Sequence, residues 1–148
     1  MKTLQEIFDI VSTHLLKQDR QAREGVDQEG FGQGICRYRS PAGLKCAVGC
    51  LITDEQYNPI MEKAGSLINF DSMQLAELEG YTESSRTQGA REVLAALTAN
   101  GIDVTAQTVQ DLLNRLQALH DNSQPNRWKD ELQRVAADYS LKYNHPEN

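Results

Sequence analysis

The chain has 148 residues, of which 39% are hydrophobic and 24% are charged, with a formal net charge of −6 and a pI of about 5.0. This length suits a single domain over residues 1–148 with a core of its own. An acidic surface disfavours direct binding to nucleic acid or to an anionic membrane, and the sequence contains no apolar run long enough to cross a bilayer.

The first predicted element is an amphipathic helix of about residues 4–18. Thr3 and Glu6 have the spacing of a capping box, and apolar residues recur at helical spacing from Leu4 to Leu15. The N-terminus contains acidic residues and does not resemble a secretory signal, so the sequence predicts a cytoplasmic protein. Three cysteines in that compartment are expected to stay reduced.

Residues 18–34 are rich in charge and contain four glycines, which predicts a long mobile loop. A short β-hairpin is predicted near residues 35–46. In this stretch Ile35 to Arg39 alternates apolar and basic residues, and the sequence Ser-Pro-Ala-Gly at 40–43 suits a type I turn.

The next stretch, CAVGCLI at 46–52, predicts a buried helical turn with Cys46 and Cys50 on one face. We interpret Gly49 as the point where a neighbouring helix crosses, because glycine lets another backbone approach closely. Thr53 and Gln56 again have capping-box spacing and predict a short helix that ends before Pro59.

The remaining sequence predicts helices at about 71–79, 85–100, 106–120 and 127–143. Gly101 suits the position that follows a helix, and Trp128, Tyr139 and Tyr143 are assigned to the core face of the last helix. The predicted fold is therefore mainly α, a compact domain of five to six helices with the small hairpin.

The cysteines allow two interpretations. Cys36, Cys46 and Cys50 with His120 could bind zinc, or a cysteine could act as a nucleophile beside the His120–Asp121 pair, which would make the protein a metal- or thiol-dependent enzyme or sensor. The simpler interpretation is that the cysteines fill a tight apolar contact, because the spacing lacks two close ligand pairs. No cofactor is predicted under this reading.

A second candidate site is cationic. If the hairpin forms, Arg37 and Arg39 share one face and Lys45 lies close to them. This patch could bind a phosphate or an acidic partner. The alternative is that the three residues pair with carboxylates of the same chain.

The run CRYRSPAGLKCAVGCLITDEQY at 36–57, with LLNRLQALHD at 112–121, resembles a family of small uncharacterised proteins of bacteria and their phages. The resemblance leaves out about residues 64–86, which we therefore interpret as an insertion. It implies a phage or mobile-element setting, and it carries no activity or catalytic residues.

Together these observations predict a small acidic binding protein that acts by protein–protein contact. Residues 51–148 carry fifteen acidic and eight basic residues, so a partner with a basic surface is favoured, such as a nucleic-acid-handling protein that is inhibited by occlusion. The carboxylates expected to make this contact are Asp103, Asp111, Asp121, Asp130, Glu131 and Asp138.

Overall fold

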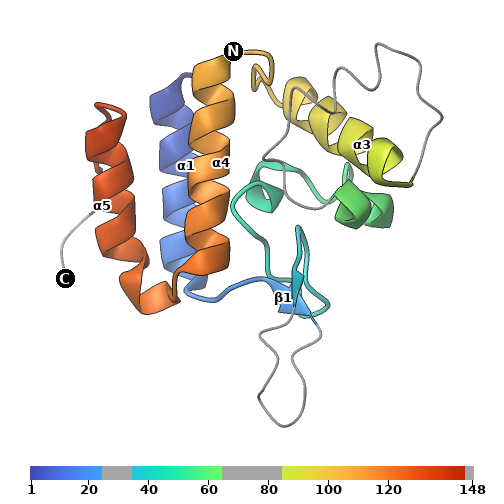
Figure 1. Cartoon of the computed structure of the whole chain (residues 1–148), viewed down its shortest axis with the longest axis horizontal. Helices are drawn as coiled ribbons and strands as arrows, with labels where there is room; N and C mark the ends of the chain where they lie inside the picture. Colours follow the sequence, from blue (N-terminus) through green and yellow to red (C-terminus); the bar gives the residue numbers. More distant parts are fainter. Residues whose placement is uncertain (25–34, 65–84, 146–148) are drawn as a thin grey trace, which may run out of the picture.

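The computed structural model describes residues 1–24, 35–64 and 85–145, most of them in helices and helical turns. Helices α1 (Leu4–Gln18), α4 (Gln107–Asn122) and α5 (Trp128–Asp138) lie side by side in Figure 1, with η4 (Pro125–Arg127) joining the last two. Helix α3 (Ser85–Ala99) lies on the other side of the molecule and packs on the 3₁₀ helix η2 (Pro59–Ala64). The predicted mainly helical fold is confirmed.

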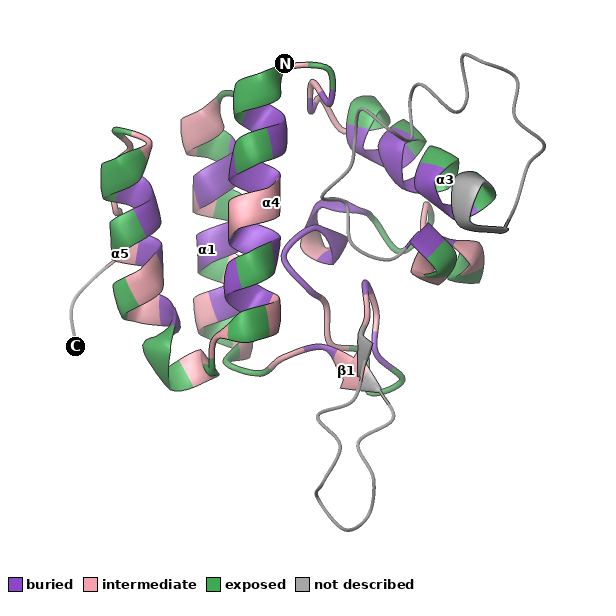
Figure 2. Cartoon of the chain, in the orientation of Figure 1, coloured by how far each residue is buried: buried purple, intermediate pink, exposed green. Residues whose placement is uncertain are grey.

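The buried side chains form one hydrophobic cluster that draws on α1, α3, α4 and α5 and on the irregular segment between α1 and α3 where it is described. Figure 2 shows the buried faces of α1, α4 and α5 turned toward one another. Trp128 and Phe8 are among the largest side chains in this core and are fully buried. Burying such aromatic rings stabilises the fold by roughly 2–3 kcal/mol each.

Helix α1 begins as predicted. The Thr3 N–H donates to Glu6 Oε1 at 3.0 Å, and the Glu6 N–H donates to Thr3 Oγ1 at 3.1 Å, so both bonds of the capping box form. The helix ends at Gln18, because Asp19 turns left-handed with φ at 52°. Helix α3 also ends as predicted, since Gly101 takes φ at +83° and its N–H donates to the Thr98 carbonyl at 3.0 Å.

Helix α5 is shorter than predicted, ending at Asp138 instead of residue 143. The Leu141 N–H donates to the Ala136 carbonyl at 2.7 Å, and Ser140 turns left-handed with φ at 56°. Tyr143 therefore lies beyond the helix, in a tail that runs beside α1. The helix ends early because the backbone of the tail bonds to the Gln5 side chain instead of continuing the helix. Gln5 Nε2 donates to the Lys142 carbonyl at 2.9 Å, and Gln5 Oε1 accepts from the Lys142 N–H at 2.8 Å.

The hairpin near 35–46 is only partly formed. Strand β2 (Ile35–Cys36) pairs antiparallel with β1 (Arg23–Glu24), which lies upstream inside the segment predicted as a loop. The turn at 40–43 does form, with the Gly43 N–H donating to the Ser40 carbonyl at 2.9 Å, but only one bridge, Arg39 with Lys45, follows it. Residues 25–34 of the predicted mobile loop, and 65–84 with the predicted helix at 71–79, lie outside the described residues.

The segment after the turn has less helix than predicted. The Cys50 N–H donates to the Cys46 carbonyl at 3.0 Å, which closes one helical turn before the short 3₁₀ helix η1 (Gly49–Leu51). The capping box of Thr53 and Gln56 is present, with bonds of 3.0 and 3.2 Å, yet it closes a turn instead of starting a helix. Pro59 begins η2, where a proline at the first position costs no hydrogen bond.

Gly49 lies at a close backbone approach, as predicted, but the neighbour is not a helix. A Cβ at this position would lie 2.2 Å from the carbonyl oxygen of Tyr38. The extended segment at 37–39 therefore crosses η1 at this point. Gly89 in α3 has the same role against η2, where a Cβ would lie 2.2 Å from the Ile60 carbonyl oxygen.

Replacing Gly49 with alanine should destabilise the protein by about 3 kcal/mol, because the clash involves backbone on both sides. Chemical denaturation of the variant measures this loss. Gly43→Asn is the matched control, since no atom lies within 4 Å of a Cβ there and asparagine tolerates its φ of +85°. We expect the control to cost no more than about 1 kcal/mol, which arises from the positive φ alone; equal stability of Gly49→Ala and the parent would contradict the crossing.

Candidate functional site

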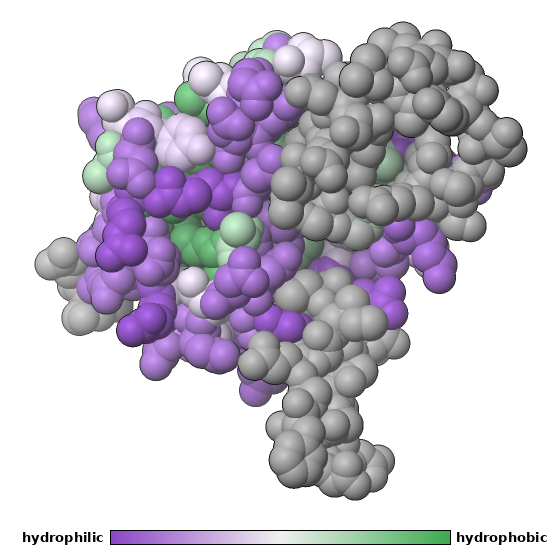
Figure 3. Space-filling model, viewed as in Figure 1, coloured by the Kyte–Doolittle hydropathy of each residue, from purple (hydrophilic) through white to green (hydrophobic). Residues whose placement is uncertain are grey.

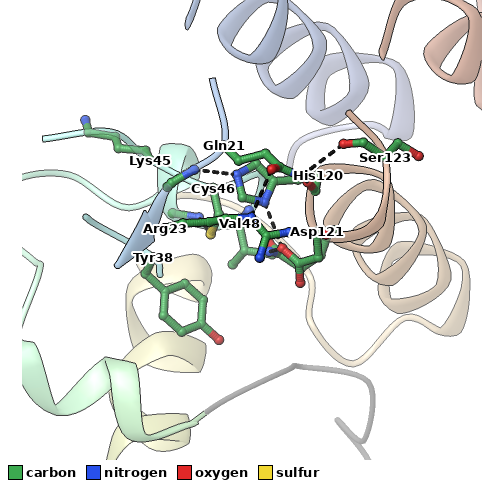
Figure 4. A network of polar contacts seen from close by, with 12 residues as sticks. Gln21, Arg23, Tyr38, Lys45, Cys46, Val48, His120, Asp121 and Ser123 are labelled. Atoms are coloured by element: carbon green, nitrogen blue, oxygen red, sulfur yellow. Dashed lines mark hydrogen bonds and ion pairs between the residues drawn. The ribbon is translucent and has the colours of Figure 1, made fainter. Parts of the chain in front are cut away.

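His120 is the centre of a buried polar network at the end of α4 (Figure 4). Its Nε2 lies 3.0 Å from the backbone nitrogen of Ala22, and its Nδ1 lies 2.7 Å from Asp121 Oδ1. A backbone N–H can only donate, so Nε2 accepts and carries no proton. The ring is therefore neutral, with its proton on Nδ1 and donated to Asp121.

The segment after α1 closes the end of α4 around this ring. Gln21 Nε2 donates to the carbonyls of His120 at 2.8 Å and of Ser123 at 3.1 Å, while Arg23 Nη2 donates to the carbonyl of Asp121 at 2.6 Å. These carbonyls have no partner within the helix, and the two side chains supply one. The Trp128 ring stacks on His120 with a centroid separation of 5.6 Å.

Gln117 extends the network to the irregular segment at residues 37–64. Its Oε1 accepts from the Val48 N–H at 3.0 Å, and its Nε2 donates to Asp121 Oδ1 at 2.8 Å. The sequence interpretation overlooked this residue and Gln21. A signal was present for Gln117, because it lies four positions after Leu113 on the apolar face of the helix. A polar residue on that face is expected to be buried and hydrogen-bonded.

The two cysteines with described side chains are not poised for thiol chemistry. Cys46 is 1% exposed and its Sγ accepts from the Gly49 N–H at 3.2 Å, while Cys50 Sγ donates to the Ala47 carbonyl at 3.0 Å. Burial raises the pKa of the Cys46 thiol far above its ordinary value and that of Cys50 to about 12. Both remain protonated thiols at neutral pH, which makes them weak nucleophiles and weak metal ligands.

His120 is not placed to bind zinc, because it too is engaged within the chain. Both ring nitrogens of His120 are occupied by Ala22 and Asp121, so neither faces a free coordination site. Within the part of the chain that the structure describes, no group of three histidine, cysteine or acidic side chains is arranged for a metal. The side chain of Cys36 lies outside that part.

A serine–histidine pair that the sequence interpretation overlooked lies between α1 and the C-terminal tail. Ser12 Oγ is 2.7 Å from His145 Nε2, the distance expected of a nucleophile and its base. The Ser12 side chain is fully buried, however, and its hydroxyl also lies 3.4 Å from the Asp9 carbonyl. A substrate carbonyl has no access to it, so this pair fixes the tail on α1.

The predicted cationic residues do lie together, and Arg39 and Lys45 both lie beside a carboxylate of the same chain. Arg39 forms an ion pair with Asp54 and donates from Nη2 to the Ile52 carbonyl at 2.8 Å, and Lys45 Nζ lies 3.6 Å from the same Asp54. Arg39 chiefly, with Lys45, lowers the pKa of Asp54 below its ordinary value, so this exposed carboxylate stays ionised. Arg37 joins the patch from the same extended segment, two positions before Arg39.

Two of the six predicted acidic residues, Asp103 and Asp121, are partly buried and bonded within the chain. Asp121 is half-buried and its Oδ1 accepts from His120 and Gln117, so this oxygen is already engaged within the chain. Asp103 is half-buried and accepts from the N–H and hydroxyl of Thr105 at 3.0 and 2.5 Å, bonds that lower its pKa. It stabilises the turn that leads into α4.

The other four carboxylates lie on the outer faces of α4 and α5. Asp111 accepts from Gln107 at 2.9 Å, and Asp138 forms an ion pair with Arg115 at 2.7 Å. Glu131 lies 3.4 Å from Arg134, and Asp130 is exposed beside it in the first turn of α5. Exposed pairs of this kind contribute about 0–1 kcal/mol, so a partner can replace them.

Comparison with protein-family models, curated proteins and solved structures gives no match for this chain. None of the helices in the described ranges is both long and apolar enough to span a bilayer.

Replacing His120 with leucine should destabilise the protein by about 1–3 kcal/mol. Leucine preserves packing beside Trp128 but leaves the Ala22 N–H buried without an acceptor. Thermal or denaturant unfolding, followed through the single tryptophan of the chain, measures the change. A variant as stable as the parent would show that the Ala22 bond does not hold the segment after α1.

The pH dependence of stability should contain a contribution from His14. Its Nε2–H donates to the Lys45 carbonyl at 3.0 Å, and burial, with the charge of Lys45, lowers its pKa below the ordinary 6.5. Because the unfolded chain then binds a proton more readily, this contribution is complete above pH 6.5 and is lost as the pH falls through the folded pKa.

His14→Gln keeps a side-chain donor for the Lys45 carbonyl and cannot titrate. Denaturant unfolding between pH 7.5 and pH 5 should therefore show a shallower loss of stability in the variant than in the parent. Parallel curves for the two proteins would contradict the proposed linkage.

Proposed function

We propose that this protein is a binding protein that acts by contact with another protein. The observation that carries the proposal is that reactive side chains of the chain are buried. His120, Cys46 and Ser12 are hydrogen-bonded to other groups of the chain. Catalytic side chains, in contrast, have to be open to a substrate. Among the described residues, many of the groups open to an outside molecule are charged side chains of the surface.

The carboxylates of α4 and α5 support a partner with a basic surface. Asp111 and Asp138 lie where α4 begins and α5 ends, and Asp130 with Glu131 lies at the opposite end of this helix pair. In Figure 3 the visible surface over these helices is largely hydrophilic, around a small hydrophobic area. A polar rim around an apolar centre is the usual anatomy of a protein interface.

The proposed mode of action is occlusion of a basic surface on the partner. A protein that handles nucleic acid presents such a surface, and carboxylates complement it electrostatically. The proposal extends to inhibition of that partner and to a phage or mobile-element setting, which the resemblance of residues 36–57 and 112–121 suggests. Charge attraction over this surface accelerates association more than it slows dissociation.

Neutralising Asp130 and Glu131 with Asp130→Asn and Glu131→Gln should weaken capture of the partner. Neutralisation is preferable to charge reversal, because both residues lie in the first turn of α5, where lysine would oppose the helix dipole. The measurement is capture from the source cells on immobilised parent and variant, at low and high salt, with quantitative mass spectrometry.

The control is Glu55→Gln with Glu92→Gln, two exposed acids that lie away from α4 and α5 and give the same change in net charge. The partner should bind the control like the parent and should be lost from the α5 variant and at high salt. Equal binding to all three proteins would contradict the acidic surface, and loss on Arg37→Ala with Arg39→Ala alone would move the contact to the cationic residues.

A further inference from the structure

A second candidate binding site lies beside the turn at 40–43. An open depression of about 480 Å³ is lined by Arg37, Arg39, Pro41, Tyr57, Pro59 and Lys63, with Glu62 at its base. This volume lies in the range of small-molecule sites. The two sides of the depression come from segments far apart in sequence, the extended stretch at 37–41 and the start of η2.

The carboxylate among the described residues that line the depression is already occupied. Glu62 Oε1 accepts from the Tyr38 N–H at 3.0 Å, and its Oε2 accepts from the Arg39 N–H at 3.1 Å and from the Tyr57 hydroxyl at 2.6 Å. Burial, with the bond to Glu62, raises the pKa of Tyr57 well above its ordinary 10.0, so the phenol stays a donor. Glu62 thus holds Tyr38, Arg39 and Tyr57 in position, and both of its carboxylate oxygens already accept hydrogen bonds.

The guanidinium of Arg39 is held in position before any ligand arrives. It lies 5.0 Å from the centre of the Tyr57 ring, it is bound to Asp54 and to the Ile52 carbonyl, and its side chain is only 14% exposed. A side chain fixed in this way loses little conformational entropy when it binds. Lys63, in contrast, is exposed and can move toward a ligand.

The described residues that line the depression are mostly basic where they are charged. Arg37, Arg39 and Lys63 line it together with one described carboxylate, Glu62, in a protein whose net charge is −6. Basic side chains around a concave surface focus the field and attract an anion.

We propose that this depression binds the dianionic phosphate group of a small phosphate monoester. Arginine and lysine are the side chains that bind phosphate most effectively, the former through paired donors and the latter as a point charge. The exposed rings of Pro41 and Pro59 supply apolar walls for the organic part of the ester.

The chemistry of the donors favours this ligand over two others. A phosphate group presents three acceptor oxygens and up to two negative charges to Arg39 and Lys63, whereas a carboxylate presents two oxygens and one charge. A long nucleic acid would meet the acidic remainder of the surface and be repelled, because its affinity depends on many phosphate contacts along one charged face. A single phosphate group needs only the depression.

Isothermal titration calorimetry at low ionic strength tests the proposal with inorganic phosphate, AMP, adenosine and acetate. Phosphate and AMP should bind with a dissociation constant of about 1 mM or below, and adenosine and acetate should bind at least tenfold more weakly. Tighter binding of AMP than of phosphate identifies a contribution from the organic part of the ester. No heat from either phosphate compound, or acetate binding as tightly as phosphate, overturns the assignment.

Two substitutions locate the site. Lys63→Gln should weaken phosphate binding about tenfold, because it removes one charge-assisted contact. Lys17→Gln is the matched control, an exposed lysine on α1 whose loss changes the net charge equally, and its affinity should stay within about twofold of the parent. Melting curves confirm that both variants fold, and equal weakening in the two shows non-specific attraction and overturns the site.

Discussion

The structure depends on satisfying the backbone of an irregular segment, residues 37–64, that is packed among helices. A buried N–H or carbonyl without a partner costs about 1–3 kcal/mol, and this segment contains only two short 3₁₀ helices to supply partners. Turn bonds within the segment supply some of the remaining partners, and side chains of α1, α4 and η2 supply others. Gln18 Oε1 accepts from the Lys45 N–H at 2.9 Å, Gln117 accepts from that of Val48, and Glu62 accepts from those of Tyr38 and Arg39.

The same requirement explains why the chemically suggestive residues are structural. His120 would be a plausible base in a cysteine or metal site, yet its two nitrogens bind the segment after α1 to the end of α4. Gly49 lies where two stretches of backbone touch and leaves no room for a Cβ, and the buried Cys46 thiol accepts from its N–H. The stretch from Tyr38 to Cys50 is therefore a tight corner of the fold.

Charge is distributed so that two surfaces of opposite character occur on one small protein. The outer faces of α4 and α5 carry exposed carboxylates, whereas the depression beside η2 gathers cationic side chains around an occupied Glu62. Both surfaces rest on rigid supports, a packed helix pair in one case and a hydrogen-bonded backbone crossing in the other. Rigid support lowers the entropy lost when a partner or ligand binds.

The sequence by itself determined the elements whose signals are local. The capping box of Thr3 and Glu6, the apolar period of α4 and the glycine after α3 each act within a few residues, so these helices could be predicted closely. Only the tertiary structure decided the end of α5, the partner of β2 and the neighbour of Gly49, because each depends on a segment distant in sequence. The same reason applies to the candidate sites. Glu62, Tyr57 and Lys63 join the arginines only when η2 packs beside the extended stretch, and no spacing in the sequence encodes that contact.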